Sequence, residues 1–202
     1  MPSAIGASVA PDTQKRVPDS RREILDAAAK LFLEKGYGDT SLRELAARVG
    51  MKAGSLYYHF TSKEQLAIEV LRIGVDTVAQ TVRARIEEAG PVTTPAERVS
   101  IAIHAHLEAL LLKSEYTSAH IRCFPYTPLA VQEELRAVRR AYEDIWARLI
   151  DDLLGPDRVE AEARYLRLAV LGALNWSLEW FDPKRDDAGD YAKALEQVIL
   201  RA

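Results

Sequence analysis

Three copies of one short pattern, Ser-x-x-Glu or Ser-x-x-Gln, divide the first third of the chain. They start at Ser20, Ser41 and Ser62. In such a capping box the two polar side chains satisfy free backbone N–H groups at the start of a helix. Gly36 and Gly50 stand where the first two helices end, because glycine adopts a left-handed backbone at little cost. The pattern predicts helices over 20–35, 41–49, 51–60 and 62–88.

The rest of the chain also has helical periodicity and lacks the alternation of polar and apolar residues that strands require. Proline or glycine separates its segments. Further helices are predicted over 95–112, 114–122, 129–154, 158–181 and 188–200. With 48% hydrophobic residues the chain can bury a core. We predict an all-α fold of about nine helices, in which a three-helix head precedes a helical body.

Three regions are expected from this pattern. Residues 1–18 hold three prolines and no helical period, so we expect a flexible tail in which Lys15 and Arg16 reach a phosphate backbone. Residues 19–79 form the head and the start of the helix that connects it to the body. Residues 80–202 form the body.

Charge is unevenly distributed over these regions. The net charge is −3, yet residues 1–66 hold ten basic and eight acidic side chains. The remainder holds 17 basic and 22 acidic ones. A basic head on an acidic body suits a protein that meets phosphate groups at one end only.

The two short helices form a helix-turn-helix, because Gly50 separates them and a packing helix precedes them. The second helix of such a unit enters the major groove of DNA with its first turn facing the bases. Small residues there allow close approach, while lysine, tyrosine and histidine donate to phosphates and base edges. The candidate DNA contacts are Thr40, Ser41, Arg43, Lys52, Ala53, Gly54, Ser55, Tyr57, Tyr58, His59 and Lys63. Alternatively, Ser41 and Ser62 are caps only, and the tyrosine pair is a packed corner.

The segments 22–37, 40–50, 52–60 and 62–66 together resemble the DNA-binding region of TetR-family repressors. The resemblance covers about 50 residues, and no residue of the motif departs from the family's pattern. It implies a fold of nine or ten helices, a homodimer, and binding to a roughly palindromic DNA operator. It also implies a cavity in the body for a small-molecule effector whose binding releases the DNA.

The last two long helices are the candidates for dimerisation. The segment 158–181 is apolar on more than one face, so it needs neighbours on both sides. A subunit interface beside the core meets this need, and small residues permit close helix approach. The family resemblance likewise implies an interface of four helices. The candidate interface residues are Leu168, Leu171, Gly172, Leu178, Leu195 and Ile199.

A cavity in the body is expected where polar residues interrupt apolar helices. The candidate pocket residues are His104, Glu108, Arg122, Tyr126, Tyr142, Trp146, Asn175, Trp176 and Glu179. The run from Asn175 to Trp180 resembles segments of TetR-type regulators of lipid and acyl-CoA metabolism, which implies a largely apolar effector of that kind. Alternatively, its tryptophans belong to the core or to an interface. His104 and His106 lie about 200° apart on a helix, so they cannot chelate one metal, and no metal or cofactor is predicted.

Other classes of protein fit the sequence less well. No glycine-rich phosphate loop, nucleophile elbow or metal-ligand cluster supports an enzyme. A helical protein-interaction bundle would account for the body but not for the head. The longest apolar run, 168–176, is about half of what a membrane crossing needs, and no secretory signal opens the chain. We therefore expect a soluble cytoplasmic protein without a membrane partner.

Overall fold

The computed structural model describes residues 20–200, except for the side chain of Ser20. The predicted tail, with Lys15 and Arg16, lies outside the described residues. The described part holds nine α-helices and no strand, which confirms the all-α prediction. No helix within residues 20–200 is long and apolar enough to cross a membrane.

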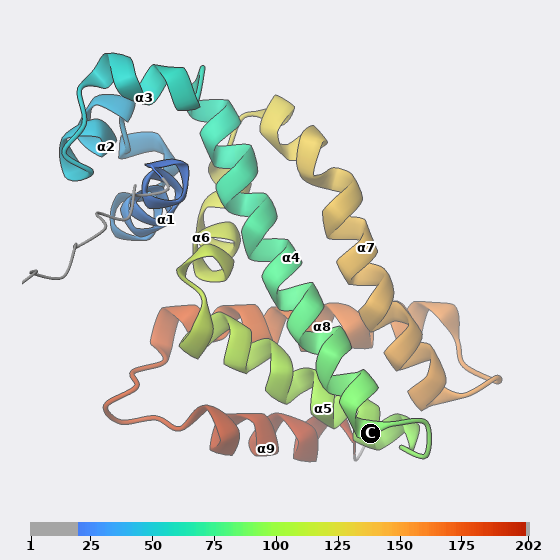
Figure 1. Ribbon diagram of the computed structural model, residues 1–202. Coiled ribbons are helices and arrows are strands. Elements are labelled where there is room, and N and C mark those ends of the chain that lie inside the picture. Colours follow the sequence, from blue (N-terminus) through green and yellow to red (C-terminus); the bar gives the residue numbers. More distant parts are fainter. Residues whose placement is uncertain (1–19, 201–202) are drawn as a thin grey trace, which may run out of the picture.

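The head comprises α1 (Ser20–Asp39), α2 (Leu42–Arg48) and α3 (Ala53–His59). Gly36 breaks α1 with φ 80°, as the sequence predicts, and a short helical stretch follows the break. Figure 1 shows these helices gathered at one end of the molecule. Their core includes Phe32, Leu45, Leu56 and Phe60, all of which are buried.

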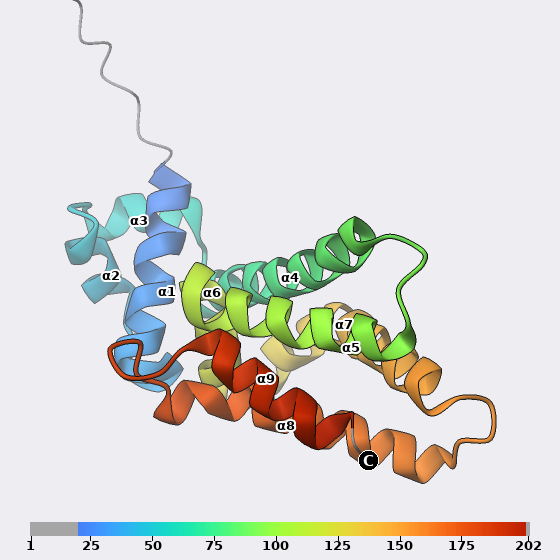
Figure 2. The same cartoon turned by 90° about the horizontal axis from the view of Figure 1, so that it is seen from below.

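The body begins with α4 (Lys63–Ala89), which runs from the head to the opposite end of the molecule (Figure 1). It continues with α5 (Pro95–Leu107), α6 (Glu115–Cys123), α7 (Leu129–Leu154), α8 (Glu160–Trp180) and α9 (Ala188–Ile199). Figure 2 shows α8 and α9 side by side along one edge of the body. The hydroxyl of Tyr191 on α9 donates to the carbonyl of Ala173 on α8 at 2.8 Å.

Two short elements join these helices. The segment predicted to continue α5 to residue 112 instead changes at Glu108 into a π-helix, η1 (Glu108–Lys113). A 3-10 turn, η2 (Phe124–Tyr126), precedes α7. The complete capping box in the body, Thr94 with Glu97 at the start of α5, was not foreseen.

Candidate DNA interface, dimer face and effector cavity

The turn between α2 and α3 is formed by local contacts. Ser41 Oγ accepts from the Glu44 backbone N–H at 3.1 Å and so begins α2. The Glu44 carboxylate does not close the predicted capping box, because it pairs with Lys35 instead. Gly50 takes φ 68°, and the N–H of Met51 donates to the carbonyl of Ala46 at 2.8 Å. These contacts fix the angle at which α3 leaves α2.

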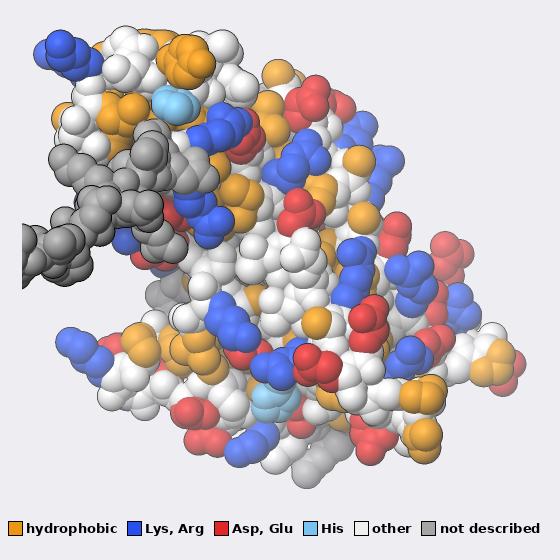
Figure 3. All heavy atoms as spheres, viewed as in Figure 1, with side chains coloured by type: hydrophobic (Ala, Val, Ile, Leu, Met, Phe, Trp, Pro, Cys, Tyr) orange, Lys and Arg blue, Asp and Glu red, His pale blue; other side chains and the backbone are white. Residues whose placement is uncertain are grey.

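The outer surface of α3 is free of contacts with the rest of the head. Leu56 is the only residue of α3 that is buried. Lys52, Ala53, Gly54 and Ser55 are exposed at its first turn. Tyr57 is 53% exposed and Tyr58 88%. Figure 3 shows apolar or tyrosine side chains beside isolated cations over this end of the head. A slim helix with small residues at its start and hydroxyls behind them can enter a major groove.

The remaining predicted DNA contacts differ in how accessible they are. Ser41 and Arg43 are exposed at the start of α2. His59 is half-buried. Lys63 Nζ donates to the carbonyl of Gly38 at 3.0 Å and lies over the Tyr37 ring. Burial lowers the pKa of Lys63.

Thr40 requires a correction. It is 3% exposed, and its hydroxyl donates to the carbonyl of Gly36 at 2.8 Å. The hydroxyl therefore stabilises the break after Gly36 and is not presented at the surface. The sequence suggested an exposed polar residue because it does not reveal which backbone carbonyls are left unpaired by the break.

An arginine that the sequence did not single out joins α1 to the far end of α3. Arg21 Nη1 donates to the carbonyl of His59 at 3.1 Å, and the guanidinium lies 4.4 Å from the centroid of the Phe60 ring. Arg21 also pairs with Glu69 of α4. The position of α3 is thereby tied to both α1 and α4.

Helix α6 belongs to the body but packs against both α1 of the head and α4. Its Tyr116 hydroxyl donates to Asp26 Oδ1 of α1 at 2.5 Å. Its Thr117 hydroxyl donates to the carbonyl of Gly74 on α4 at 3.1 Å. The Nδ1–H of His120 donates to the carbonyl of Leu71 at 3.0 Å. A movement of α6 would therefore also displace α1 and α4, the two helices to which α3 is tied.

Gly74 is required where α4 and α6 cross. A Cβ atom added there would lie 2.3 Å from the carbonyl oxygen of Tyr116. Real contacts of this kind are never so short, so any side chain would push the two helices apart. This requirement could not be predicted from the sequence, because a glycine within a helical pattern has many causes.

A partly open cavity of about 70 Å³ lies among α4, α5, α6, α7 and α8. Its polar lining is formed by His106, Thr117, His120, Arg139, Tyr142, Glu143 and Asn175. The apolar lining includes Val75, Val78, Ile121 and Leu171. Tyr142 and Asn175 were predicted for the pocket, whereas Arg139 and Glu143 were not. The same cavity borders Gly74, so its occupant would touch the crossing of α4 and α6.

His106 organises the inner wall of this cavity. Its Nδ1 lies 2.6 Å from the Tyr142 hydroxyl, and its Nε2 lies 3.2 Å from Asn175 Oδ1. Burial lowers the pKa of His106 to about 4, so the ring is neutral at pH 7. An amide oxygen only accepts, so Nε2–H donates to Asn175 and the Tyr142 hydroxyl donates to Nδ1. The amide N–H groups of Asn175 remain available to an occupant.

The nine predicted pocket residues do not gather in one place. Trp146 is fully buried beside His106, with ring centroids 6.1 Å apart. Arg122 and Glu179 form a surface ion pair at 3.5 Å. Tyr126 is 78% exposed and Trp176 67%. Neither of these aromatic residues lines the cavity, because each stands on the outer side of its helix or turn.

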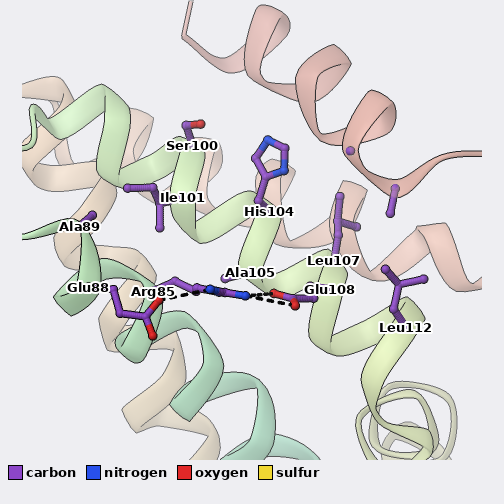
Figure 4. A pocket seen from close by; sticks show the side chains of 12 residues that line it. Arg85, Glu88, Ala89, Ser100, Ile101, His104, Ala105, Leu107, Glu108 and Leu112 are labelled. Carbon is purple, nitrogen blue, oxygen red and sulfur yellow. Dashed lines mark hydrogen bonds and ion pairs between the residues drawn. The ribbon is translucent and has the colours of Figure 1, made fainter.

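His104 and Glu108 line a separate outer groove of about 680 Å³ between α4, α5, η1 and the start of α9. Figure 4 shows the Arg85 guanidinium between the carboxylates of Glu88 and Glu108. Arg85 lies 3.2 Å from each of them. His104 Nε2 lies 2.9 Å from Glu196 Oε1. The charges of this groove are thus paired with one another, and the groove does not touch α6.

An apolar face of α8 is left uncovered. Tyr165, Leu168, Trp176 and Trp180 are 63%, 51%, 67% and 38% exposed. With Gly172, which is also exposed, they recur every three or four residues and so share one side of the helix. Val198 of α9 is 73% exposed. Single exposed apolar residues are ordinary, but a contiguous row marks an interaction surface.

The predicted interface residues divide between this face and the core. Leu168 and Gly172 lie on the exposed face, while Leu171, Leu178 and Leu195 are half-buried. Ile199 is only 8% exposed and belongs to the core of its own protomer. Ile199 is therefore a core residue and not an interface residue. Trp176, which was predicted for the pocket, lies on the exposed face instead.

Comparison with known proteins gives two matches to family models. The model described as bacterial regulatory proteins of the tetR family matches residues 24–70. The model described as the tetracyclin repressor-like C-terminal domain matches residues 92–202. Together they cover the head and most of the body.

Individual proteins show the same likeness. The transcriptional repressor KstR2 of Mycolicibacterium smegmatis is 36% identical over 50% of this chain and 48% of its own length. The match thus spans about half of that relative. The transcriptional regulator LmrA of Bacillus subtilis is 35% identical over 67% of this chain and 71% of its own length. The crystal structure of AibR with isovaleryl coenzyme A and operator DNA is 22% identical with a TM-score of 0.78, covering 89% of this chain and 97% of that one. This last likeness concerns the fold.

Proposed function

We propose that this chain, which belongs to the tetR family of bacterial regulatory proteins, is a homodimeric repressor that binds a palindromic DNA operator and releases it when a small effector occupies the body. Residues 19–79 are the DNA-binding unit, and residues 80–202 bind the effector and form the dimer. A protein that acts on the chromosome in this way works in the cytoplasm and needs no catalytic step.

The observation that carries the proposal is the exposed first turn of α3. Lys52 and Tyr57 are exposed beside Gly54, and Lys52 carries no cap hydrogen bond that would hold its side chain to the helix. We propose that this turn faces base edges, while Tyr57, Tyr58 and His59 donate to the flanking phosphates. Ser41, Arg43 and Lys63 contact the neighbouring backbone.

The exposed face of α8 is the surface through which two copies of the chain form the dimer. Burying Leu168, Trp176 and Trp180 against the same face of a partner removes a large apolar area from water. Gly172, at the middle of the face, lets the two helices approach closely. Such a symmetric pair places its two α3 helices about 34–36 Å apart, one turn of DNA.

The effector site is the cavity beside His106, since it borders both α4 and α6. An effector that enlarges this cavity displaces α6 from Gly74 and so turns α1 and α4 against each other. The two recognition helices then no longer match one turn of DNA. The lining combines apolar side chains with polar groups, as small-molecule sites do. A short acyl compound, such as an acyl-CoA, is the class that we expect.

Selection of DNA sites from a random pool tests the proposal. The purified protein should enrich a palindrome and bind it at least about 1000-fold more tightly than unrelated DNA. A variant with both Lys52→Ala and Tyr57→Ala should lose most of this preference. Arg83→Ala, which removes an exposed cation of α4, is the matched control and should bind as the wild type does. Equal binding of all DNA sequences would overturn the proposal.

A further inference from the structure

The outer edge of the effector cavity is formed by α7. Arg139 and Glu143 line the cavity and also a surface groove of about 280 Å³ with Phe124, Leu129 and Gln132. The two hollows thus share a wall made of these two side chains. A compound that passes this wall would have one end inside the protein and the other in the groove.

Arg139 is poorly compensated for a half-buried cation. Its guanidinium lies 3.7 Å from the centroid of the Phe124 ring. Its nearest carboxylate is Glu143, at 3.8 Å between Nη2 and Oε1, which is beyond hydrogen-bond distance. Burial lowers the pKa of Arg139. A planar guanidinium with unused donors binds carboxylates and phosphates in two-point fashion.

Two more arginines stand on the same side of α7. Arg136 lies one helical turn before Arg139 and Arg140, which are consecutive, and all three line the same groove. Arg136 pairs with Glu133, whereas Arg140 makes no ion pair with any residue in 20–200 and is exposed. Figure 3 shows basic and acidic side chains mixed along the edge that α7 occupies. The groove itself holds three arginines and two glutamates.

The inner part of the cavity has the opposite character. His106 and His120 are neutral, because burial lowers their pKa values to about 4 and about 3. The charge of Arg139 also lowers the pKa of His120. Thr117, Tyr142 and Asn175 complete the inner polar groups without any charge. A volume of about 70 Å³ admits only a short group, and the neutral inner side chains favour one without charge.

We infer that the effector is an organic anion whose short uncharged acyl end enters the cavity beside Asn175 and whose anionic end is held in the groove by Arg139 and Arg140. This rests on the proposed function of the cavity as the effector site. In a coenzyme A thioester the Asn175 amide donates to the acyl carbonyl oxygen, and the phosphates are the anionic end in the groove. In a free acid the alkyl chain is the uncharged end, and the carboxylate itself is the anionic end.

Titration calorimetry on the full-length dimer tests the inference with three forms of the same short acyl chains. These are the free acid (isovalerate among them), the coenzyme A thioester and the neutral amide, with coenzyme A alone as a reference. The acid or the thioester should bind at least about tenfold more tightly than the amide. Whichever of the two binds more tightly identifies the source of the anion. The inference is overturned if the amide binds with equal affinity, or if neither anionic form binds.

Substitutions on α7 locate the anion. Arg139→Gln and Arg140→Gln should each weaken the tighter anionic form by about tenfold and reduce the dependence of its affinity on salt. Arg139→Lys should retain part of the affinity. Arg148→Gln removes an exposed arginine of the same helix that lines neither hollow and should change nothing. Because Arg140 is exposed, its substitution does not threaten folding, and an unchanged affinity in that variant contradicts the assignment.

The same samples separate this inference from the proposed function. If the wild type binds its operator but substitution of either arginine leaves the anion affinity unchanged, the inference fails and the proposed function stands. If anions bind as described but no DNA sequence is preferred, the proposed function fails instead. In the expected case, operator release by the anion requires about tenfold more ligand in Arg140→Gln than in the wild type.

Discussion

The α3 face of the head and the α8 face of the body both expose aromatic side chains, yet they suit different partners. Tyr57 and Tyr58 are 53% and 88% exposed and stand beside Lys52 and Ser55 on a short helix. Trp176 and Trp180 are 67% and 38% exposed and share their face with Leu168. The first face offers hydroxyl and ammonium donors, whereas the second offers almost only apolar surface.

The difference shows that exposure alone does not identify a partner. Hydrogen-bond donors around small residues lose little when they exchange water for phosphate and base edges. A row of apolar side chains gains only when water is removed from both partners, which a second copy of the same face achieves. Changes to the α3 face should therefore weaken DNA binding directly, whereas changes to the α8 face should prevent dimerisation.

The largest effect is expected from a charge on the α8 face. Trp176→Glu should give a monomer, because a carboxylate would be buried in the dimer without a partner. Operator affinity should fall by at least about 100-fold, since one recognition helix then acts alone. Sedimentation and DNA titration measure the two effects. Val92→Glu, at a residue 92% exposed before α5, is the control, and a variant Trp176→Glu that still dimerises would refute this use of the face.

The second effect concerns the crossing that joins the two regions. Gly74→Ala should lower the free energy of unfolding by about 3 kcal/mol, because its Cβ would meet the Tyr116 carbonyl and α4 and α6 must separate. Urea denaturation measures it. Gly54→Ala adds the same methyl where nothing lies within 4 Å and should not lower the stability. Equal stability of the two variants would show that the crossing tolerates displacement.

The third effect is a pH dependence that originates in the body. His106 and His120 are buried, with pKa values lowered to about 4 and about 3, whereas in the unfolded chain they titrate near 6.5. Above pH 6.5 both states bind no proton at these rings and the stability is complete. As the pH falls below 6.5, only the unfolded state gains protons, so stability falls by about 1.4 kcal/mol per unit for each histidine.

Comparison of unfolding at pH 7.5 and pH 5 isolates this contribution. The acid-induced loss in His106→Gln should be smaller than in the wild type by about 2 kcal/mol, the amount expected for one histidine between pH 6.5 and 5. The carboxylates, which are common to both proteins, cancel in the difference. Identical losses would mean that His106 is not held neutral.

The smallest effect is expected from a single hydroxyl on the α3 face. Tyr57→Phe should weaken operator binding about fivefold, the magnitude of one hydrogen bond, and leave the free energy of unfolding unchanged. Tyr57→Ala should weaken it further, because the ring is lost as well. Fluorescence anisotropy with labelled operator distinguishes the three proteins, and if both variants bind as tightly as the wild type, Tyr57 faces away from DNA.

The head could be predicted closely from the sequence because its signals are local. Caps and glycines within a few residues of each other determine where α2, α3 and α4 begin. The exposed first turn of α3 followed from the same spacing. Thr40, predicted to contact DNA, instead donates its hydroxyl to the carbonyl of Gly36.

The body was predicted less completely because its site depends on how distant helices meet. Consecutive residues of a helix, such as Asn175 and Trp176, point in different directions, but the sequence does not reveal which of them faces inward. Residues 104 and 106 likewise point apart, into the outer groove and the cavity. Arg139 could not be found, because an arginine on a long charged helix is normally a solvated side chain. The change to a π-helix at Glu108 leaves the apolar pattern almost unaltered and gave no signal.

The spacing of the two halves of the operator tests most directly whether a symmetric pair presents two α3 helices to one side of the DNA. Once a selected palindrome is available, about five base pairs inserted at its centre turn one half-site to the opposite side of the duplex. The account predicts that binding falls by at least about 100-fold with this insertion and recovers in part with about ten. Equal affinity for all three spacings would contradict it.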